Sequence, residues 1–442
     1  MNNIVIPILV IISIFTIIIL TSRFRLHAFV ALFIVSLFLA FTTLPPHEVM
    51  TAVKEGFGST MGSIGFLIIL GAMIGIILDK TGGTLSIANY ILGKTGKRRS
   101  AEAMGITGYI TGLPIFCDSG FIILSGLAKS LSAKSMVPAP FITTALACSL
   151  YSVHCLIPPH PGALAAAGMM NVNIGYLIMA GAFLAIPGVV AAFFWSRWIS
   201  RKLNTAPANP SPDERIPRQE LPPVFFAFLP VAAPLLLITV KSLITIADKS
   251  GGSIAAQIFL FPGEPVIALS IGVLLALFLV REKSVRTMNE LFSEAVVKAG
   301  PILIITAAGG MFGLVIRSTG TGELLGKMLA DTGAGLIVPF LIAAVMKTAQ
   351  GSSTVAIITA AAFIAPMLPV LNLESETGRL LATLSMGAGS MFVSHANDSY
   401  FWVVSNFGEL ETNTSLKVYS TSTMIMGTVV FACILILSLL IK

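Results

Sequence analysis

The sequence predicts an all-α, polytopic membrane protein with inverted repeats and broken-helix, re-entrant hairpins. Of its 442 residues, 55% are hydrophobic and only 11% are charged, and the mean hydropathy is +0.93. A soluble domain usually carries about 25% charged residues. Apolar runs of spanning length recur along the whole chain, and several are interrupted by Gly, Pro and polar residues. These interruptions fall in matching positions of the two halves.

Eleven apolar runs are the candidate membrane helices, and some are shorter than the roughly 20 residues that a spanning helix needs. They occupy residues 4–20, 28–43, 61–78, 138–157, 168–195, 223–245, 265–280, 300–316, 335–346, 380–393 and 423–441. Stretches 101–131 and 347–371 are also apolar but are broken by Gly, Pro or hydroxyl residues. The first run lacks a preceding basic segment and a following cleavage site, so we expect a retained helix and not a signal peptide.

Basic residues gather in four clusters, which predict the orientation in the membrane. The clusters lie at residues 23–25, 94–99, 197–218 and 281–298. Placing all four in the cytoplasm satisfies the positive-inside rule. This predicts a multi-pass protein of a bacterial inner membrane, with lipid as a partner, the N-terminus outside and the central linker in the cytoplasm. We find no basic patch interleaved with aromatic residues, so nucleic acid is not an expected partner.

The two halves resemble each other in sequence. Segment 71–82 and segment 309–320 both contain two glycines four residues apart, a charged residue and a Thr-Gly pair at the same spacing. The helix at 61–78, which carries the glycines of the first motif, should run inward and its counterpart at 300–316 outward, which is the inverted-topology repeat of secondary transporters. We therefore predict a first transmembrane repeat at 1–196, a cytoplasmic linker at 197–222 and a second transmembrane repeat at 223–442.

Segment 112–120 is the first interruption that contains candidate functional residues. Gly112 and Pro114 in this segment would interrupt a helix. A half-helix that begins near Asp118 or Ser119 would present free N–H groups to an anion. Ser119 is a natural N-cap. Two roles remain open for Asp118. It is a proton carrier, because burial favours a neutral carboxyl group, or it only caps the helix.

The counterpart is segment 348–354, which contains Gly351 and three consecutive hydroxyl residues, Ser352, Ser353 and Thr354. Gly351 permits close approach of the backbone, and the hydroxyl groups can donate to a polyol or a carboxylate. Hydroxyl groups at a helix end also bond back to their own backbone. At membrane depth, in the matching position of a repeat, we favour a substrate site.

A second interruption lies at 154–162, where three prolines and a glycine end a helix. His160 is held in this rigid segment and could bind an anion or relay protons. His154 lies earlier, within the helix, and is expected to be a packed or hydrogen-bonded core residue.

The counterpart of this second interruption is segment 394–402. Asp398 is the second candidate proton carrier, and His395 and Asn397 are candidate substrate ligands. Trp402 could equally anchor the chain at the membrane interface.

These four segments together resemble the gluconate permease family, within the larger ion-transporter superfamily. The motifs are Gly-Leu-Pro-Ile-Phe-Cys-Asp-Ser-Gly at 112–120, His-Cys-Leu-Ile-Pro-Pro-His-Pro-Gly at 154–162, Gly-Ser-Ser-Thr-Val-Ala at 351–356 and Asn-Asp-Ser-Tyr-Phe-Trp at 397–402. The resemblance implies proton-coupled uptake of aldonates such as gluconate, with relatives taking other hydroxy acids or D-serine. A dimer is common in this superfamily, so a homodimer is an expectation from resemblance alone. Many family members carry Glu at the position of Asp118, and the shorter side chain favours a differently sized acid such as glycerate.

The resulting hypothesis is a secondary active transporter that imports a small hydroxy-acid anion by proton symport. The substrate carboxylate would lie near Ser119 and residues 352–354, His160 and Asn397 would bind hydroxyl groups, and Asp118 or Asp398 would carry the proton. We expect no cofactor, no metal site and no enzyme activity. Segment 93–95 lacks the earlier glycine of a P-loop, so an ion gradient is the expected energy source. The alternatives are a sodium-coupled carboxylate carrier, a D-serine transporter and a membrane-embedded enzyme.

Overall fold

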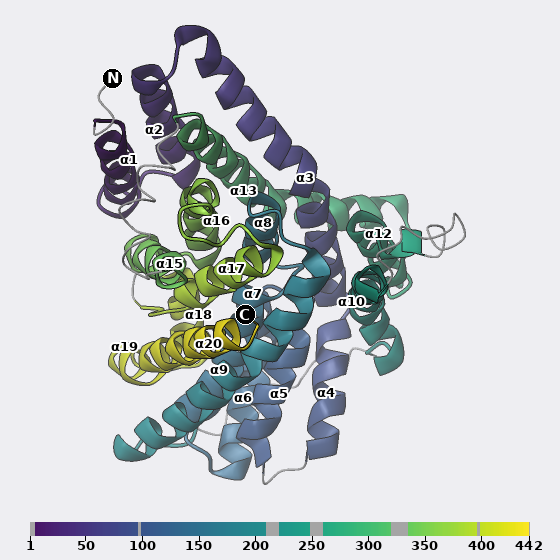
Figure 1. Cartoon of the computed structure of the whole chain (residues 1–442). Coiled ribbons are helices and arrows are strands. Elements are labelled where there is room, and N and C mark those ends of the chain that lie inside the picture. Colours follow the sequence, from purple (N-terminus) through teal and green to yellow (C-terminus); the bar gives the residue numbers. More distant parts are fainter. Residues whose placement is uncertain are drawn as a thin grey trace.

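The computed structural model describes residues 5–95, 99–208, 221–247, 260–319, 335–395 and 398–441, and this part of the chain is helical without a strand (Figure 1). The first half contains α1 (Val5–Ser22), α2 (Ala28–Thr43), α3 (Pro46–Lys80), α4 (Gly83–Thr95), α5 (Ser100–Gly112), α6 (Cys117–Ser135), α7 (Ala139–Leu156), α8 (Pro161–Met169) and α9 (Ile174–Lys202). The second half contains α10 (Val224–Ala247), the 3-10 turn η2 (Phe261–Gly263), α12 (Pro265–Leu277), α13 (Val285–Ser318), α15 (Ile337–Gln350), α16 (Ser353–Ile364), the 3-10 turn η3 (Ala365–Met367), α17 (Glu376–Ser390), α18 (Ser399–Phe407), α19 (Thr412–Ser415), the π-helical turn η4 (Leu416–Ser420) and α20 (Thr421–Leu440). The all-α fold class is confirmed.

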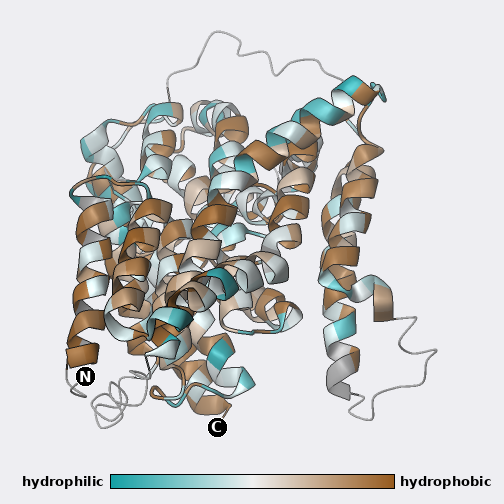
Figure 2. Ribbon diagram, turned by 90° about the horizontal axis from the view of Figure 1, so that it is seen from above, coloured by the Kyte–Doolittle hydropathy of each residue, from teal (hydrophilic) through white to brown (hydrophobic). Residues whose placement is uncertain are grey.

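The helices have the length and surface of a membrane protein. Five helical segments of the described chain are long and apolar enough to cross a membrane, and α3, which bends by 42°, would make a sixth. Large apolar side chains such as Phe66, Phe183, Phe225 and Leu439 are exposed on the helices, and much of the helical ribbon in Figure 2 has the colour of hydrophobic residues. Contiguous apolar surface is unfavourable in water but suits contact with lipid tails. The chain is a multi-pass membrane protein.

Two helices begin much earlier than their apolar runs, which were predicted at 61–78 and 300–316. Helix α3 begins at Pro46, where the fixed backbone angle of proline suits the first helical position. Helix α13 begins after Ser284, whose side chain accepts a hydrogen bond from the backbone N–H of Thr287 at 3.1 Å. Hydropathy marks only the part of a helix that lies in lipid, so the polar first turns were missed.

Helices α3 and α13 pack side by side along much of their length and run in opposite directions (Figure 1). Gly56, near the start of α3, lies directly against Met311, near the end of α13. At the other end of the pair, Lys80 forms a 3.0 Å ion pair with Glu294. Because the two helices carry the matching glycine motifs, their opposite directions agree with an inverted repeat.

Apart from α4, whose matching segment in the second half lies outside the described residues, and the short elements α19 and η4, the main elements follow the same order in both halves. A long helix (α3 or α13) is followed by a broken pair (α5–α6 or α15–α16), a second broken pair (α7–α8 or α17–α18) and a final long helix (α9 or α20). The boundaries at 196 and 222 stay a prediction, and residues 209–220 of the predicted linker lie outside the described residues.

The buried residues form two large hydrophobic clusters. One involves α6, α7, α9, α15 to α17 and α20, and the other involves α1 to α3, α12, α13 and α16. Helix α7 is buried along almost its whole length, and α16 contributes to both clusters. The interruptions of the broken pairs pack around these two helices, and the candidate site is built there.

Candidate functional site

The first interruption separates α5 from α6, as predicted. Helix α6 begins at Cys117, and its N-cap position is Phe116, which provides no capping side chain. The first N–H groups of α6 therefore have no acceptor within the helix. The prediction that Ser119 is the N-cap is wrong, because the helix begins two residues earlier. Its hydroxyl group instead accepts a 2.7 Å hydrogen bond from Nζ of Lys298 in α13.

The counterpart of the first interruption, segment 348–354, separates α15 from α16. Gly351 ends α15 with a φ of +83°, in the left-handed region that only glycine adopts readily. Ser352 is the N-cap of α16, and its hydroxyl group accepts a 3.3 Å hydrogen bond from the N–H of Val355. Ser353 is buried and Thr354 is half-buried. Hence one of the three predicted hydroxyl ligands, Ser352, already bonds to its own helix.

A buried ion pair joins the end of α15 to the start of α18. Nζ of Lys347 lies 2.6 Å from Oδ2 of Asp398, and it also donates to the carbonyl oxygen of Gly351. Asp398 further accepts hydrogen bonds from the hydroxyl group of Ser394 and from the N–H of Tyr400, at 3.0 Å, and so caps α18. Both oxygens of this carboxylate are therefore engaged. The sequence pattern predicts Asp398 as a site residue but does not indicate Lys347 as its partner.

Two histidines connect the interruptions. Nε2 of His160 donates a 2.6 Å hydrogen bond to the carbonyl oxygen of Gly112, at the end of α5. Nε2 of His154 is hydrogen-bonded to Oγ1 of Thr354 at 3.2 Å, so His154 is the hydrogen-bonded core residue that was expected. The two imidazole rings lie 4.8 Å apart, and the ring of Phe116 packs on both. First-half and second-half interruptions thus meet through these rings.

Asp118 differs from Asp398 in its contacts. Its Oδ1 is buried and has no hydrogen-bond partner in the part of the chain that the structure describes. The carboxyl group is within electrostatic reach of Asp398, Lys298 and Lys347. Counted as ionised, the two lysines balance Asp118 and Asp398, so these four groups together carry no net charge. Asp79 of α3 is also within electrostatic reach of Lys298, and its Oδ1 is likewise buried without a hydrogen-bond partner among the described residues. Within the group of four, Oδ1 of Asp118 remains free to accept a proton.

The remaining predicted ligands are His395 and Asn397, which follow α17. His395 is half-buried beside Thr348, after the end of α17. Asn397 lies outside the described residues. Among the described residues, no group of three or more His, Cys, Asp or Glu side chains could hold a metal ion.

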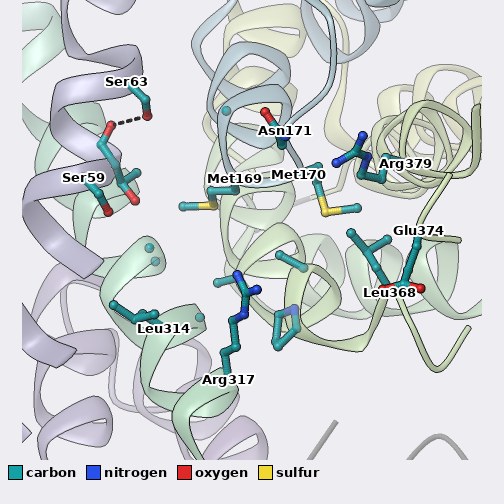
Figure 3. A pocket seen from close by; sticks show the side chains of 18 of the residues that line it. Ser59, Ser63, Met169, Met170, Asn171, Leu314, Arg317, Leu368, Glu374 and Arg379 are labelled. Atoms are coloured by element: carbon teal, nitrogen blue, oxygen red, sulfur yellow. Dashed lines mark hydrogen bonds between the residues drawn. The ribbon is translucent and has the colours of Figure 1, made fainter. Parts of the chain in front are cut away.

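A large cavity lies elsewhere, between α3 and α13 on one side and α8, α16 and α17 on the other (Figure 3). It has a volume of about 620 Å³, and none of the predicted site residues lines it. We call it the α3–α13 cavity. Its wall includes Gly309, Gly310 and Gly313 of α13, which belong to the second glycine motif or adjoin it.

The two glycine motifs have different neighbours. A Cβ atom added to Gly75 of α3 would lie 2.9 Å from the carbonyl oxygen of Pro114, so the first interruption is docked on α3. The counterpart of Gly75 is Gly313, and the counterpart of Pro114 is Ser352. Gly313 instead contacts Ala362, about ten residues or roughly 15 Å further along α16. In the first half, the interruption is packed against the glycine motif of α3, whereas in the second half the glycine motif of α13 borders the cavity.

Comparison with known proteins decides the family. The profile of the GntP family permeases matches residues 5–440. The chain belongs to the GntP permease family. An uncharacterized permease of Haemophilus influenzae is 32% identical over 95% of this chain and 90% of its own length. The gluconate permease of Pseudomonas aeruginosa is 30% identical, covering 97% and 96%, and the Gnt-II system L-idonate transporter of Escherichia coli is 27% identical, covering 91% and 92%.

Solved structures support the same fold for this GntP permease. The YdaH transporter of Alcanivorax borkumensis superposes with a TM-score of 0.62 at 16% identity, covering 88% of this chain and 89% of its own. MtrF of Neisseria gonorrhoeae gives a TM-score of 0.59 at 15% identity, covering 88% and 83%. At such identities the likeness concerns the fold alone, which is that of a polytopic membrane transporter. The family resemblance found in the four motifs is confirmed.

Proposed function

We propose that this GntP permease imports a small hydroxy-acid anion, gluconate-like or as small as glycerate, by proton symport across a bacterial inner membrane. Relatives named for gluconate and L-idonate support the substrate class. The observation that carries the proposal is the charge-balanced group of two lysines and two aspartates at the helix interruptions. Of its two carboxylates, only that of Asp118 keeps an oxygen without a hydrogen-bond partner in the described part of the chain.

The interruptions offer donors to a carboxylate. The N-termini of α6 and α16 present backbone N–H groups and positive dipole ends, and anions are stabilised at such termini. Nζ of Lys298 adds a positive charge beside Ser119. The hydroxyl groups of Ser353 and Thr354 and the amide of Asn397 would bind the hydroxyl groups of the substrate.

Charge balance explains why a proton would accompany the anion. The cluster has no net charge with both lysines and both aspartates ionised. A monoanion brings it to −1, and one added proton restores neutrality, which lowers the cost of keeping the cluster in a low-dielectric environment. Asp118 is the better proton acceptor, because protonating Asp398 would break its ion pair with Lys347.

The unequal docking of the glycine motifs supports alternating access over a passive channel. With one half closed and the other bordering a cavity, the substrate path is not open along its length. In inverted-repeat transporters, access alternates when one unit moves against the other around the site. The orientation predicted from the basic clusters places the α3–α13 cavity toward the outside, as import requires.

Uptake into proteoliposomes tests the proposal. One monoanion with one proton moves no net charge, so an imposed pH gradient should drive D-gluconate or D-glycerate accumulation and an imposed potential should not. A zwitterion such as D-serine with one proton would instead gain about 2.3 kcal/mol per 100 mV. Failure of both gradients to drive accumulation would refute proton symport. Accumulation that follows Na⁺ at fixed pH would assign sodium coupling, and a chemically altered substrate would indicate an enzyme.

A further inference from the structure

The α3–α13 cavity contains two arginines that lie outside the helix interruptions. Arg317 lies in the last turn of α13 and Arg379 near the start of α17, and their side chains reach the cavity from different walls (Figure 3). Within the described chain, neither guanidinium group has a hydrogen-bond or ion-pair partner, and Nε of Arg379 is buried. Glu374 also lines the cavity, and both Glu374 and Arg317 are exposed, whereas Arg379 is half-buried.

A guanidinium group with a buried, unsatisfied N–H is unfavourable unless an acceptor is supplied. Leaving such a donor unpaired costs about 1–3 kcal/mol, and more when the group is charged. Guanidinium groups bind carboxylates through parallel N–H bonds. With two arginines and one exposed glutamate, the lining has an excess of positive charge. The missing partner is therefore expected to be an anion.

The other walls provide neutral hydrogen-bonding groups. Ser59 and Ser63 line the cavity from α3, and Asn171 lines it from the segment after α8. The hydroxyl group of Ser63 donates to the carbonyl oxygen of Thr60 at 3.0 Å, and its lone pairs remain able to accept. Hydroxyl and amide groups opposite a pair of arginines match a molecule with a carboxylate at one end and hydroxyl groups along its length.

The dimensions and position suit a site that is occupied before the helix interruptions. A volume of about 620 Å³ falls within the roughly 300–1,000 Å³ of small-molecule sites. The cavity extends along α13 from Gly309 to Arg317, about 12 Å at 1.5 Å per residue. It therefore reaches from within the span to the end of a membrane helix. Helix α16 forms part of its wall and begins, at its other end, with the predicted hydroxyl ligands.

We propose that the α3–α13 cavity is an anion-binding vestibule, in which Arg317 and Arg379 bind the carboxylate of a hydroxy acid before it reaches the helix interruptions. Ser59, Ser63 and Asn171 bind the hydroxyl groups of the same molecule. The identity of the acid rests on the proposed function, whereas the attraction of anions rests on the cavity itself.

Uptake kinetics provide the first test. Arg317→Gln and Arg379→Gln should each raise the KM for D-gluconate or D-glycerate about tenfold to a hundredfold, the range expected for a charge-assisted hydrogen bond. The maximal rate should stay within about twofold, because saturating substrate restores occupancy and the later steps are untouched. Arg286→Gln is the matched control, since Arg286 is an exposed residue of the same helix, paired with Glu290. An unchanged KM in both variants, or a lost maximal rate at unchanged KM, overturns the vestibule.

Thiol labelling tests the attraction of anions without depending on transport. A Ser63→Cys variant is made with Cys433→Ser, because the other three cysteines are buried and Cys433 is only half-buried. In permeabilised membranes, the reaction rates of an anionic and a cationic methanethiosulfonate reagent are compared. Replacing both arginines with Gln should lower the anionic-to-cationic ratio about tenfold, from the Coulomb energy of two charges at roughly 10 Å in water.

The two tests separate the vestibule from the proposed function. A ratio that does not respond to the arginines overturns the vestibule, even if the permease accumulates hydroxy acids with protons. A ratio that falls, with D-gluconate slowing the labelling at millimolar concentration, supports the vestibule. A ratio that falls in a protein that transports no hydroxy acid supports the anion site and refutes the proposed substrate class.

Discussion

Replacing Lys347 with Met should destabilise the permease by about 3–5 kcal/mol, because the change leaves a buried carboxylate without its counter-charge. Nζ of Lys347 and Oδ2 of Asp398 are 2.6 Å apart, and the two side chains are 0% and 4% exposed. At that distance and an effective dielectric constant of about 20, their attraction is roughly 6 kcal/mol before desolvation is subtracted. The remaining hydrogen bonds of Asp398, from Ser394 and Tyr400, keep the loss below that value.

Unfolding in detergent micelles, followed by tryptophan fluorescence, measures this loss. Lys347→Met and Asp398→Asn each remove one charge, and the double variant removes both. The double variant should be more stable than the sum of the single effects predicts, by about 2–3 kcal/mol, because it leaves no unpaired buried charge. Lys80→Met is the control, since its partly exposed pair with Glu294 is worth at most about 1 kcal/mol. Additive effects, or single variants within 1 kcal/mol of the parent, would refute the ion-pair argument.

Three further predictions concern transport. Asp118→Asn should abolish proton-driven accumulation while substrate exchange persists, and normal accumulation would exclude Asp118 from coupling. Lys298→Met removes the charge-assisted hydrogen bond to Ser119 and should raise the KM of uptake roughly tenfold, whereas an unchanged KM would exclude Lys298 from the site. Gly75→Ala should slow uptake, because an added methyl group would lie 2.9 Å from a backbone oxygen of the docked interruption. Gly62→Ala is the control and should leave the rate unchanged, since Gly62 lies on the same helix with open space around it. Equal uptake rates of the two variants would contradict the docking.

The sequence was sufficient to locate the helix interruptions, because Gly, Pro and hydroxyl residues are costly inside a membrane helix unless they line a site. Gly351 adopts the left-handed conformation for which glycine is needed, and Asp398 is part of a buried polar cluster. Lys347 was missed because it lies at the end of an apolar run, where a basic residue normally marks the membrane edge. Lys298 was assigned to a cytoplasmic basic cluster for the same reason.

The functions of these lysines depend on contacts between distant segments. Lys298 reaches Ser119 only because α13 packs near the start of α6, and no local pattern encodes that approach. The positions of the two arginines in the α3–α13 cavity could not be predicted for the same reason. Arg317 was noted only as part of a repeated motif, and Arg379 precedes an apolar run in the sequence.

The proposed transport cycle connects the docking of the interruptions to the charge of the cluster. If the halves are inverted repeats, the opposite arrangement brings Ser352 against Gly313, closes the α3–α13 cavity, and separates Pro114 from Gly75. During this change the lysine–aspartate cluster would have to cross a region of low dielectric constant. It is neutral when empty and neutral when it holds one monoanion with one proton, but it is charged with either alone. Movement with only one of the two is then disfavoured by the cost of moving a net charge, which is the physical condition for obligatory coupling.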